Sequence, residues 1–457
     1  MFKRVFKQLK ILFIIRSPEH FSRYESIIIS SLRRGHNIIT LFDKECSKEK
    51  DIAKLEEFKN RSKTFNYHWL INRNDSWQII LFILRSLLTY RRFLTIKDQS
   101  SFFRERWRTY MPFWLRIPVS IPGIAVFIKT NLIGSFLKKI ETKIPADKKI
   151  VNQLKEYKPD IVISPLGGVR VLSPNIEYIS AAKVLNIPTA SPTISWDSLT
   201  TKSLITVFPN IFLLWNNFHE KQILEHHGVT KDRVRIIGAS VFDKWFGKLN
   251  PNKRNDFCFQ YNLNPDNHII LYLGSAKGTA KDERWIVERL RSALDDSKNE
   301  KLKNAQIVVR PHPANPIFLQ QLNIKGVWVF PKSGALPDSK ETLQQSYDMY
   351  YHSIATVGIF TSAMMEALII GKPLTVLIEP KYKKTQTDTE HFQDFIKSRA
   401  VVQSNNFDEC IKFFESTLKN NFLDPEIKKE FILEYVRPKG IEISAGENSI
   451  REIEKLL

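Results

Sequence analysis

The sequence predicts an α/β protein made of two Rossmann-like, doubly wound domains that face a cleft. Short apolar runs rich in β-branched residues alternate with helical patterns almost throughout, which is typical of βαβ units and parallel sheets. A chain of 457 residues also exceeds the size at which single hydrophobic cores stop growing. A polar, turn-rich stretch at 247–256 separates two series of such units, so we expect domains at 1–246 and 257–423.

The first half contains apolar runs that predict buried parallel strands. Between the first two runs, Ser22 to Arg33 carries apolar side chains at helical spacing, and Gly35 follows as a stop signal. The strands predicted from these runs are Leu12–Ile15, Ile38–Leu41, Ile161–Ser164, Ile211–Leu214 and Val234–Ile237.

The second half repeats this alternation more regularly. Because ligands of such sheets bind beyond the carboxyl ends of the strands, the functional residues should directly follow strands. The predicted strands are Ile269–Leu273, Ile307–Val309, Val327–Phe330, Ala355–Val357 and Leu374–Leu377.

Composition excludes several classes of protein. Hydrophobic residues at 43% and charged residues at 26% are ordinary globular values, which excludes disordered and fibrous chains. Cys46, Cys258 and Cys410 lie too far apart for a disulfide framework or a zinc motif, so we expect a reducing, cytoplasmic compartment and no metal site. The apolar run Ile11 to Ile15 is too short for a cleaved signal.

The positive charge of the chain is concentrated near its beginning. Residues 1–150 contain 30 Lys/Arg against 13 Asp/Glu, a net charge of +17 out of +21 for the whole chain. Nucleic acid, an anionic membrane or a polyanionic acceptor could each be the partner of such a surface.

A basic, aromatic-rich insert at about 75–150 narrows this choice. It mixes Trp, Phe, Leu and Ile with Arg and Lys, and its apolar runs are interrupted by Arg85, Pro118, Pro122 and Lys129, so we expect no transmembrane helix. An amphipathic surface in the headgroup region of the inner membrane face is one interpretation. A helical hairpin packed on its own domain is the other, and nucleic acid is the least favoured partner.

Two motifs follow the first two strands of the second half. Gly274-Ser275-Ala276-Lys277 precedes a helix expected from about Asp282, and small residues there would let backbone N–H groups approach a phosphate. Arg310-Pro311-His312-Pro313 follows the next strand, where the prolines fix the backbone around His312. A planar guanidinium and an imidazole held there suit a pyrophosphate.

A third motif follows the strand at Ala355. Thr361 or Ser362 is expected to cap the helix that begins at Ala363, and Glu366 lies one turn inside that helix. A carboxylate at this place could accept hydrogen bonds from both ribose hydroxyls, or could simply complement the helix dipole.

In this order and spacing the motifs resemble the nucleotide-binding domain of GT-B glycosyltransferases, near the CDP-glycerol glycerophosphotransferase and capsule-polysaccharide transferase branch. The resemblance implies that Arg310, His312 and Ser362 contact the donor phosphates and that Glu366 contacts the ribose. Residues 424–457 would then form helices that cross back to the first domain.

The first half offers a candidate base. The resemblance implies a W-H-G-T-P-L-K motif in the stretch that begins at Ser195. The spacing from Trp196 to Lys202 is kept, but Asp197 stands at the place of the histidine. An inverting sugar transferase needs a base for the acceptor hydroxyl, so Asp197 is the candidate catalytic residue beside His312. Its alternative is a turn Asp, and Lys202 could neutralise a phosphate.

Other residues that follow first-half strands are candidates for the acceptor side of the cleft. They are Ser17, Glu19, His20, Gly167, Gly168 and Arg170, and Trp196 and Lys202 beside Asp197 are candidates for the same side.

We therefore expect an inverting, metal-independent transfer of sugar from a nucleotide-activated donor of unspecified base to a glycan or lipid-linked acceptor, with no cofactor required. Three alternatives remain open. One is glycerophosphate transfer, which Asp197 argues against. Another is a UDP-N-acetylglucosamine 2-epimerase, whose G-T-R-P-E opening differs from Ile15-Arg16-Ser17-Pro18-Glu19. The third is a non-catalytic scaffold of polysaccharide assembly.

Overall fold

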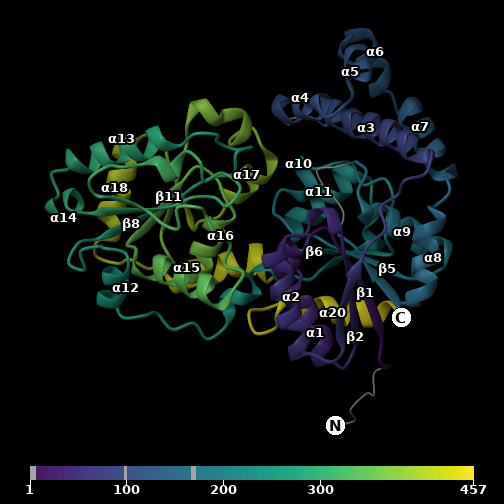
Figure 1. Cartoon of the computed structure of the whole chain (residues 1–457). Coiled ribbons are helices and arrows are strands. Elements are labelled where there is room, and N and C mark those ends of the chain that lie inside the picture. The colour runs from purple at the N-terminus through teal and green to yellow at the C-terminus, as the bar shows by residue number, and fades with distance from the viewer. Residues whose placement is uncertain (1–6, 97–99, 166–170) are drawn as a thin grey trace. The chain divides into compact units, whose positions relative to one another are not determined.

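The computed structural model describes residues 7–96, 100–165 and 171–457, and it divides the chain into two compact units. The first unit comprises the residues up to Asp243 together with Glu434–Leu457, and the second is Lys244–Leu433. Each unit contains its own parallel sheet (Figure 1).

Within the described residues, the first unit has a seven-stranded parallel sheet in the order β3-β2-β1-β4-β5-β6-β7, so the order reverses between β1 and β4. Its strands are β1 Lys10–Ile15, β2 Asn37–Phe42, β3 Phe65–Trp69, β4 Ile161–Ile163, β5 Thr189–Pro192, β6 Ile211–Leu214 and β7 Val234–Ile236. Its helices are α1 Glu25–Arg33, α2 Glu49–Arg61, α3 Trp77–Thr95, α4 Ser101–Thr109, α5 Phe113–Ser120, α6 Pro122–Lys129, α7 Asn131–Lys143, α8 Lys148–Tyr157, α9 Pro174–Val184, α10 Ser198–Thr201, α11 Asn217–His227 and α20 Ala445–Leu456.

The buried strand β1 contributes to two hydrophobic cores of this unit, one on each face of the sheet. Ile11 and Phe13 point to the face covered by α1 and α20, whereas Leu12 and Ile14 point to the face covered by α8 and α9. A strand buried on both faces needs a continuous apolar run, which is why the sequence KILFII predicts a strand.

The second unit, within its described residues, has a six-stranded parallel sheet in the order β10-β9-β8-β11-β12-β13, with its reversal between β8 and β11. Its strands are β8 Ile269–Leu273, β9 Gln306–Arg310, β10 Val327–Val329, β11 Ala355–Gly358, β12 Leu374–Leu377 and β13 Val401–Ser404. Its helices are α12 Arg254–Gln260, α13 Arg284–Asp295, α14 Glu300–Lys303, α15 Lys340–His352, α16 Ala363–Ile370, α17 Glu390–Phe395, α18 Phe407–Thr417 and α19 Pro425–Phe431.

The predicted fold class is confirmed: both units are doubly wound parallel sheets, and the end of the chain returns to the first unit. The last helix, α20, packs on α1, where Arg34 donates to Glu454 at 2.6 Å. Part of the stretch predicted as a linker, from Arg254 onwards, is helical, because α12 begins there.

The insert forms α3 to α7, which lie together at one end of the first unit (Figure 1). Buried ion pairs fix it to the rest of that unit. Arg85 donates to Glu141 of α7 at 2.7 Å and to Glu177 of α9 at 2.5 Å, and Glu177 also accepts from Arg73 at 2.9 Å.

Candidate functional site

The residues predicted to bind a donor lie at the carboxyl edge of the second sheet. Gly274 follows β8, Arg310 ends β9, and Thr361 and Ser362 follow β11. β8 lies between β9 and β11 in the sheet, and the strand order reverses there. Since ligands of doubly wound folds bind at such a reversal, the predicted motifs meet at the expected place.

Arg310, Tyr350 and Glu366 form a buried hydrogen-bonded trio beneath this edge. The Arg310 Nη1 donates to Tyr350 Oη at 2.7 Å and to Glu366 Oε2 at 3.1 Å, and Tyr350 Oη lies 2.8 Å from the same carboxylate oxygen. Arg310 is 7% exposed and Glu366 8% exposed. The two side chains are therefore bonded to each other. A direct contact of either one with phosphate or ribose stays a prediction.

The surroundings keep the Arg310 guanidinium charged and the Tyr350 hydroxyl neutral. Burial acts to lower the pKa of Arg310, but the neighbouring Tyr350 and Glu366 outweigh it, so this pKa is raised. Burial raises the pKa of Tyr350 well above its usual value, so its hydroxyl remains a neutral donor. A charged guanidinium and a phenol thus hold Glu366 in place from α15 and β9.

The loop after β8 is held from inside by a carboxylate that the sequence did not single out. Glu283, the residue before α13, accepts hydrogen bonds from the Ser275 backbone N–H at 2.7 Å and from Tyr272 Oη at 3.0 Å. Ser275 is fully buried, and its Oγ accepts from the Phe360 backbone N–H at 3.3 Å. Ser275 therefore holds the loop from inside and does not present the backbone N–H that was expected to approach a phosphate. Lys277, in the same loop, is exposed.

Glu283 is also the most perturbed acid of this edge. Complete burial raises its pKa to about 7, although the hydrogen bonds from Ser275 and Tyr272 act in the opposite direction. The loop is also close-packed at Gly274, where a Cβ would lie 2.8 Å from Leu319 Cδ1 and 3.2 Å from the backbone O of Arg310 and the backbone N of His312.

His312 has a defined tautomer. Its Nδ1 accepts a hydrogen bond from the Ala314 backbone N–H at 3.0 Å, so in the neutral ring the proton is on Nε2. The side chain is partly exposed. Gly334, in the turn after β10, packs so closely on this turn that a Cβ on Gly334 would lie 2.8 Å from Pro313 Cα. The rigid Pro-His-Pro turn therefore presents a hydrogen-bond donor at the sheet edge.

The helix α16 begins without the predicted cap. Ser362 has helical dihedral angles and its side chain makes no capping hydrogen bond, so the expected cap by Thr361 or Ser362 is wrong for Ser362. The backbone carbonyl of Thr361 instead accepts from Met364 N at 3.0 Å. Ser362 is exposed and Thr361 partly exposed, which leaves two hydroxyls and the positive end of a helix at the switch point.

The candidate base Asp197 follows β5 in the first unit and lies among hydrogen-bond donors. Its carboxylate accepts from Ser195 Oγ, from Thr201 Oγ1 at 2.8 Å and from Lys202 Nζ at 2.9 Å. Its side chain is 30% exposed. Trp196 is instead buried against the rings of Trp215, His219 and Tyr435, so it shapes the core and not a binding surface.

The insert holds the Asp197 segment by its backbone. Arg92 of α3 donates to the Lys202 carbonyl at 2.7 Å, while Arg106 and Trp107 of α4 donate to the Thr201 carbonyl at 2.6 and 3.2 Å. No local pattern in the sequence predicts this contact, because it joins segments about 100 residues apart. The insert is therefore part of the support of the candidate base.

Of the remaining first-unit candidates, Ser17 is structural. It is buried, accepts from the Glu19 backbone N–H at 3.3 Å and donates to the Cys46 carbonyl at 3.0 Å. Burial, then Arg23 and Arg16, lower the pKa of His20 to about 4, so His20 is neutral at pH 7, and Glu19 is exposed. Gly167, Gly168 and Arg170 lie outside the described residues.

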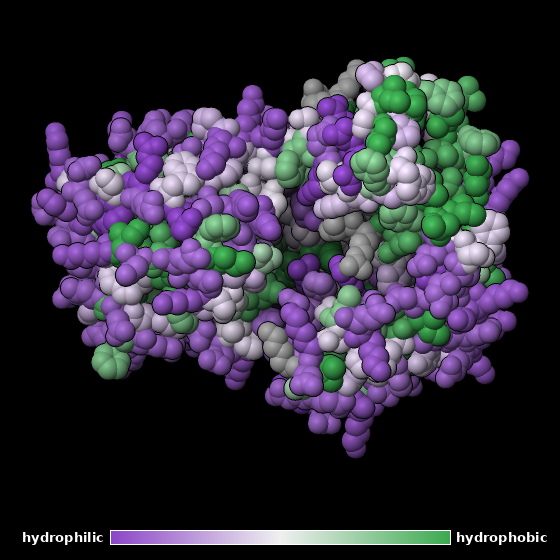
Figure 2. Space-filling view, turned by 45° about the horizontal axis from the view of Figure 1, so that its top comes forward, coloured by the Kyte–Doolittle hydropathy of each residue, from purple (hydrophilic) through white to green (hydrophobic). Residues whose placement is uncertain are grey.

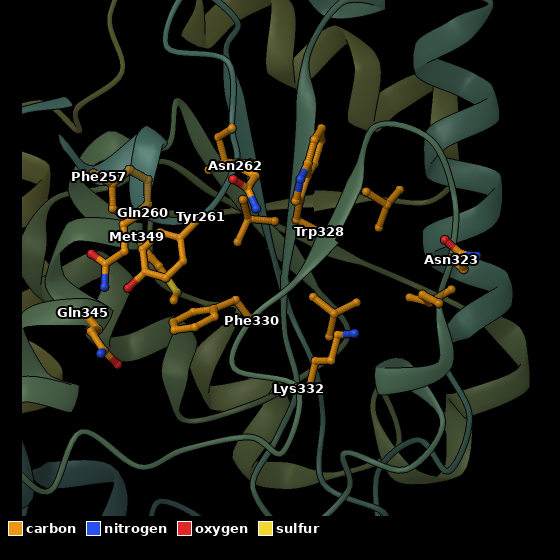
Figure 3. Close-up of a pocket in the computed structure, with 15 residues that line it drawn as sticks. Phe257, Gln260, Tyr261, Asn262, Asn323, Trp328, Phe330, Lys332, Gln345 and Met349 are labelled. Carbon is orange, nitrogen blue, oxygen red and sulfur yellow. The ribbon is translucent and has the colours of Figure 1, made fainter. Parts of the chain in front are cut away.

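The second unit also contains an open pocket of about 520 Å³ beside the edge strand β10 (Figure 3). The Tyr261 and Phe330 rings lie against each other there, with centroids 4.2 Å apart, and Trp328 and Lys332 line it as well. None of the residues predicted to bind a donor lines this pocket, so we place the candidate site at the sheet edge and not here.

Comparison with known proteins supports the fold and not a particular family. No family model and no curated protein matches the sequence. A glycosyltransferase from Rickettsia africae superposes with a TM-score of 0.56 at 13% identity, covering 98% of each chain. The Methanocaldococcus jannaschii UDP-GlcNAc 2-epimerase, solved with UDP-GlcNAc and UDP, gives 0.53 at 15% identity, covering 98% of this chain and all of that one. Arabidopsis thaliana UGT89C1 complexed with UDP-L-rhamnose gives 0.50 at 14% identity, covering 98% and 99%.

These structures and the strand orders lead to one conclusion. The chain has the two-domain parallel α/β fold found in GT-B glycosyltransferases and UDP-GlcNAc 2-epimerases.

Proposed function

We propose that the protein is a glycosyltransferase that moves a sugar from a nucleotide-activated donor to a surface-polysaccharide, glycan or lipid-linked acceptor. The observation that carries the proposal is the edge of the second sheet. There Thr361, Ser362 and the uncapped start of α16 lie at the strand-order reversal together with the fixed donor His312. Such groups suit a diphosphate, and neighbours of the same fold were solved with UDP-sugars.

The proposed reaction inverts the anomeric centre. The acceptor hydroxyl oxygen attacks the anomeric carbon, the bond from that carbon to the donor phosphate breaks, and the electron pair leaves with the nucleotide. Asp197 takes the hydroxyl proton. His312 Nε2 and the start of α16 stabilise the charge that develops on the leaving phosphate, without a metal ion.

In this proposal Arg310 acts through its neighbours. It holds Glu366 under the sheet edge, and Glu366 orients the ribose when the donor binds. Lys277, exposed on the loop after β8, adds positive charge near the phosphates. We place the protein in the cytoplasm, in agreement with the free thiols of Cys46, Cys258 and Cys410.

The donor site is tested by measuring the binding of a panel of nucleotides and nucleotide sugars with thermal shift and calorimetry. We expect one nucleotide class to stabilise the wild type. His312→Ala and Ser362→Ala should each weaken that binding by about 10- to 100-fold, the value of a hydrogen bond to a charged group. Ser416→Ala, an exposed serine in α18, is the matched control and should bind normally. If no nucleotide binds to folded protein, the scaffold alternative replaces the transferase.

An epimerase is the second candidate, since epimerases share the fold at similar TM-scores. The two reactions differ in what they need. Incubation with the bound nucleotide sugar and no acceptor should leave it unchanged if the protein is a transferase. Conversion into a 2-epimer, read by NMR, would assign the epimerase reaction instead. Transfer of a glycerophosphate group from CDP-glycerol would instead assign the glycerophosphotransferase reaction.

A further inference from the structure

The outer face of the insert is an exposed apolar surface. Of the eighteen exposed large hydrophobic residues found among the described residues, thirteen lie in α3–α7 and their connections. Figure 2 shows hydrophobic side chains gathered over α5–α7, at the upper right of the view. The residues that form this outer face are Phe113, Trp114, Ile117, Ile121, Ile124, Val126, Phe127, Leu132 and Phe136.

Packing within the unit does not account for this face. The inner sides of the same helices already form a small core, in which Val119 and Ile128 pack against Tyr90 and Met111. Leu132 is 82% exposed and Phe113 71% exposed. An exposed apolar patch of this extent marks an interaction surface. The interpretation of the insert as a hairpin packed on its own domain therefore holds for the inner side only.

The charge around the outer face selects its partner. From Met111 to Ile140 the sequence contains no Asp or Glu, and its charged residues are Arg116, Lys129, Lys138 and Lys139. The three lysines are exposed. Aromatic and aliphatic side chains flanked by cations, without anions, match the anionic headgroups and upper acyl chains of a bilayer. A protein partner would gain nothing from this uniform charge unless it were itself acidic.

The dimensions exclude a deeper insertion. The helices α5 and α6 have eight residues each, or about 12 Å. Pro112, Pro118 and Pro122 interrupt the run. Among the described residues no helix combines the length and apolar character needed to cross a bilayer. The outer face can therefore enter only the headgroup region and the first part of the acyl chains.

We infer that the outer face of α5–α7 docks the protein on an anionic phospholipid bilayer. The inference extends the proposed function by naming the surface and the kind of lipid, and it does not depend on the identity of the donor. Arg92, Arg106 and Trp107, which hold the Asp197 segment, belong to helices α3 and α4 of the same insert. Docking therefore holds the candidate base at a fixed height above the lipid surface, where a lipid-linked acceptor would lie.

Co-sedimentation with vesicles tests the inference without any sugar transfer. Wild type should bind phosphatidylcholine vesicles that contain phosphatidylglycerol more strongly than vesicles of phosphatidylcholine alone, and salt should weaken that binding. The triple variant Phe113→Ser/Trp114→Ser/Phe127→Ser should bind anionic vesicles at least about tenfold more weakly. Its control replaces exposed apolar residues of the second unit, Phe259→Ser/Ile317→Ser, and should bind normally.

The lysines give a second, independent arm. Lys138→Gln/Lys139→Gln should lose on the order of 10- to 30-fold of the binding to anionic vesicles, while Lys298→Gln/Lys301→Gln in the second unit should not. Equal binding of the triple variant and wild type, or no binding by wild type, would overturn the inference. So would a wild-type oligomer, seen by light scattering, that the triple variant converts to monomer, because the face would then join two copies. Nucleotide binding measured on the same variants keeps this outcome separate from that of the proposed function.

Discussion

The buried pair of Arg310 and Glu366 allows a quantitative test of the candidate site. In Glu366→Gln the guanidinium stays buried, 7% exposed, but loses its counterion. Removing one partner of a buried ion pair costs about 3–5 kcal/mol, and because glutamine keeps part of the hydrogen bonding we expect about 3 kcal/mol. For a unit of this size that loss lowers the melting temperature by about 6–12 °C.

A double-mutant cycle separates this cause from a general disturbance. Arg310→Met should cost a similar amount, since it leaves the Glu366 carboxylate buried without a cation, with Tyr350 as its hydrogen-bond donor. The double variant Arg310→Met/Glu366→Gln should be less destabilised than the sum of the two single variants, with a coupling of about 2–3 kcal/mol. Scanning calorimetry measures all three variants and resolves the transition of the second unit. Additive effects would refute the pairing, and so would a loss below about 1 kcal/mol for Glu366→Gln.

Three further predictions concern other buried or reactive groups. The pKa of Glu283 is raised from 4.5 to about 7, so its protonated form contributes stability that is complete below about pH 4.5 and lost as the pH rises through 7. Glu283→Gln should therefore become more stable relative to wild type by up to about 3 kcal/mol between pH 4.5 and pH 8, and urea unfolding at both pH values would disprove this if the difference stayed constant. Glu177→Leu removes the carboxylate shared by Arg85 and Arg73, which keep Glu141 and Asp75, and should cost about 3 kcal/mol in the first unit, whereas an unchanged melting temperature would show that the ion network does not fix the insert. Asp197→Asn should reduce transfer by about 10²- to 10⁴-fold in an initial-rate assay with nucleotide binding unchanged, and retention of the rate would remove Asp197 as the base.

Most of the strands that the sequence predicted are buried on both faces, although the edge strands Val234–Ile236 and Val327–Val329 were predicted as well. Ile269–Leu273 and Leu374–Leu377 have their predicted bounds, because a parallel strand with helices on both sides must be apolar throughout. The strands that were missed, Phe65–Trp69 and Val401–Ser404, are edge strands with exposed polar positions. Their short, mixed runs resemble loops, and only their pairing with a neighbour makes them strands.

The candidate site was predictable to the same extent. Arg310 ends a strand, and His312 and Ser362 lie in the short segments that follow strands, so the local sequence predicted their place at the sheet edge. Tyr350 and Glu283 were not predicted. Tyr350 lies within α15 and Glu283 directly precedes α13, and only the folded chain brings Tyr350 to Arg310 and Glu283 to Ser275. The insert was recognised as basic and amphipathic, but which side of it would be covered depends on packing that sequence does not reveal.

The packing of α20 on the first unit has a consequence for synthesis of the protein. Ile450 and Ile453 complete the core that contains Ile11 and Phe13, and a Cβ on Gly446 would overlap Ser26 of α1. The second unit, by contrast, is one uninterrupted stretch of chain. On the ribosome the second unit therefore has all its segments first, while β1 waits with an incomplete apolar face until translation of α20 is finished. Nascent chains that stop before α20 should be the ones that chaperones retain.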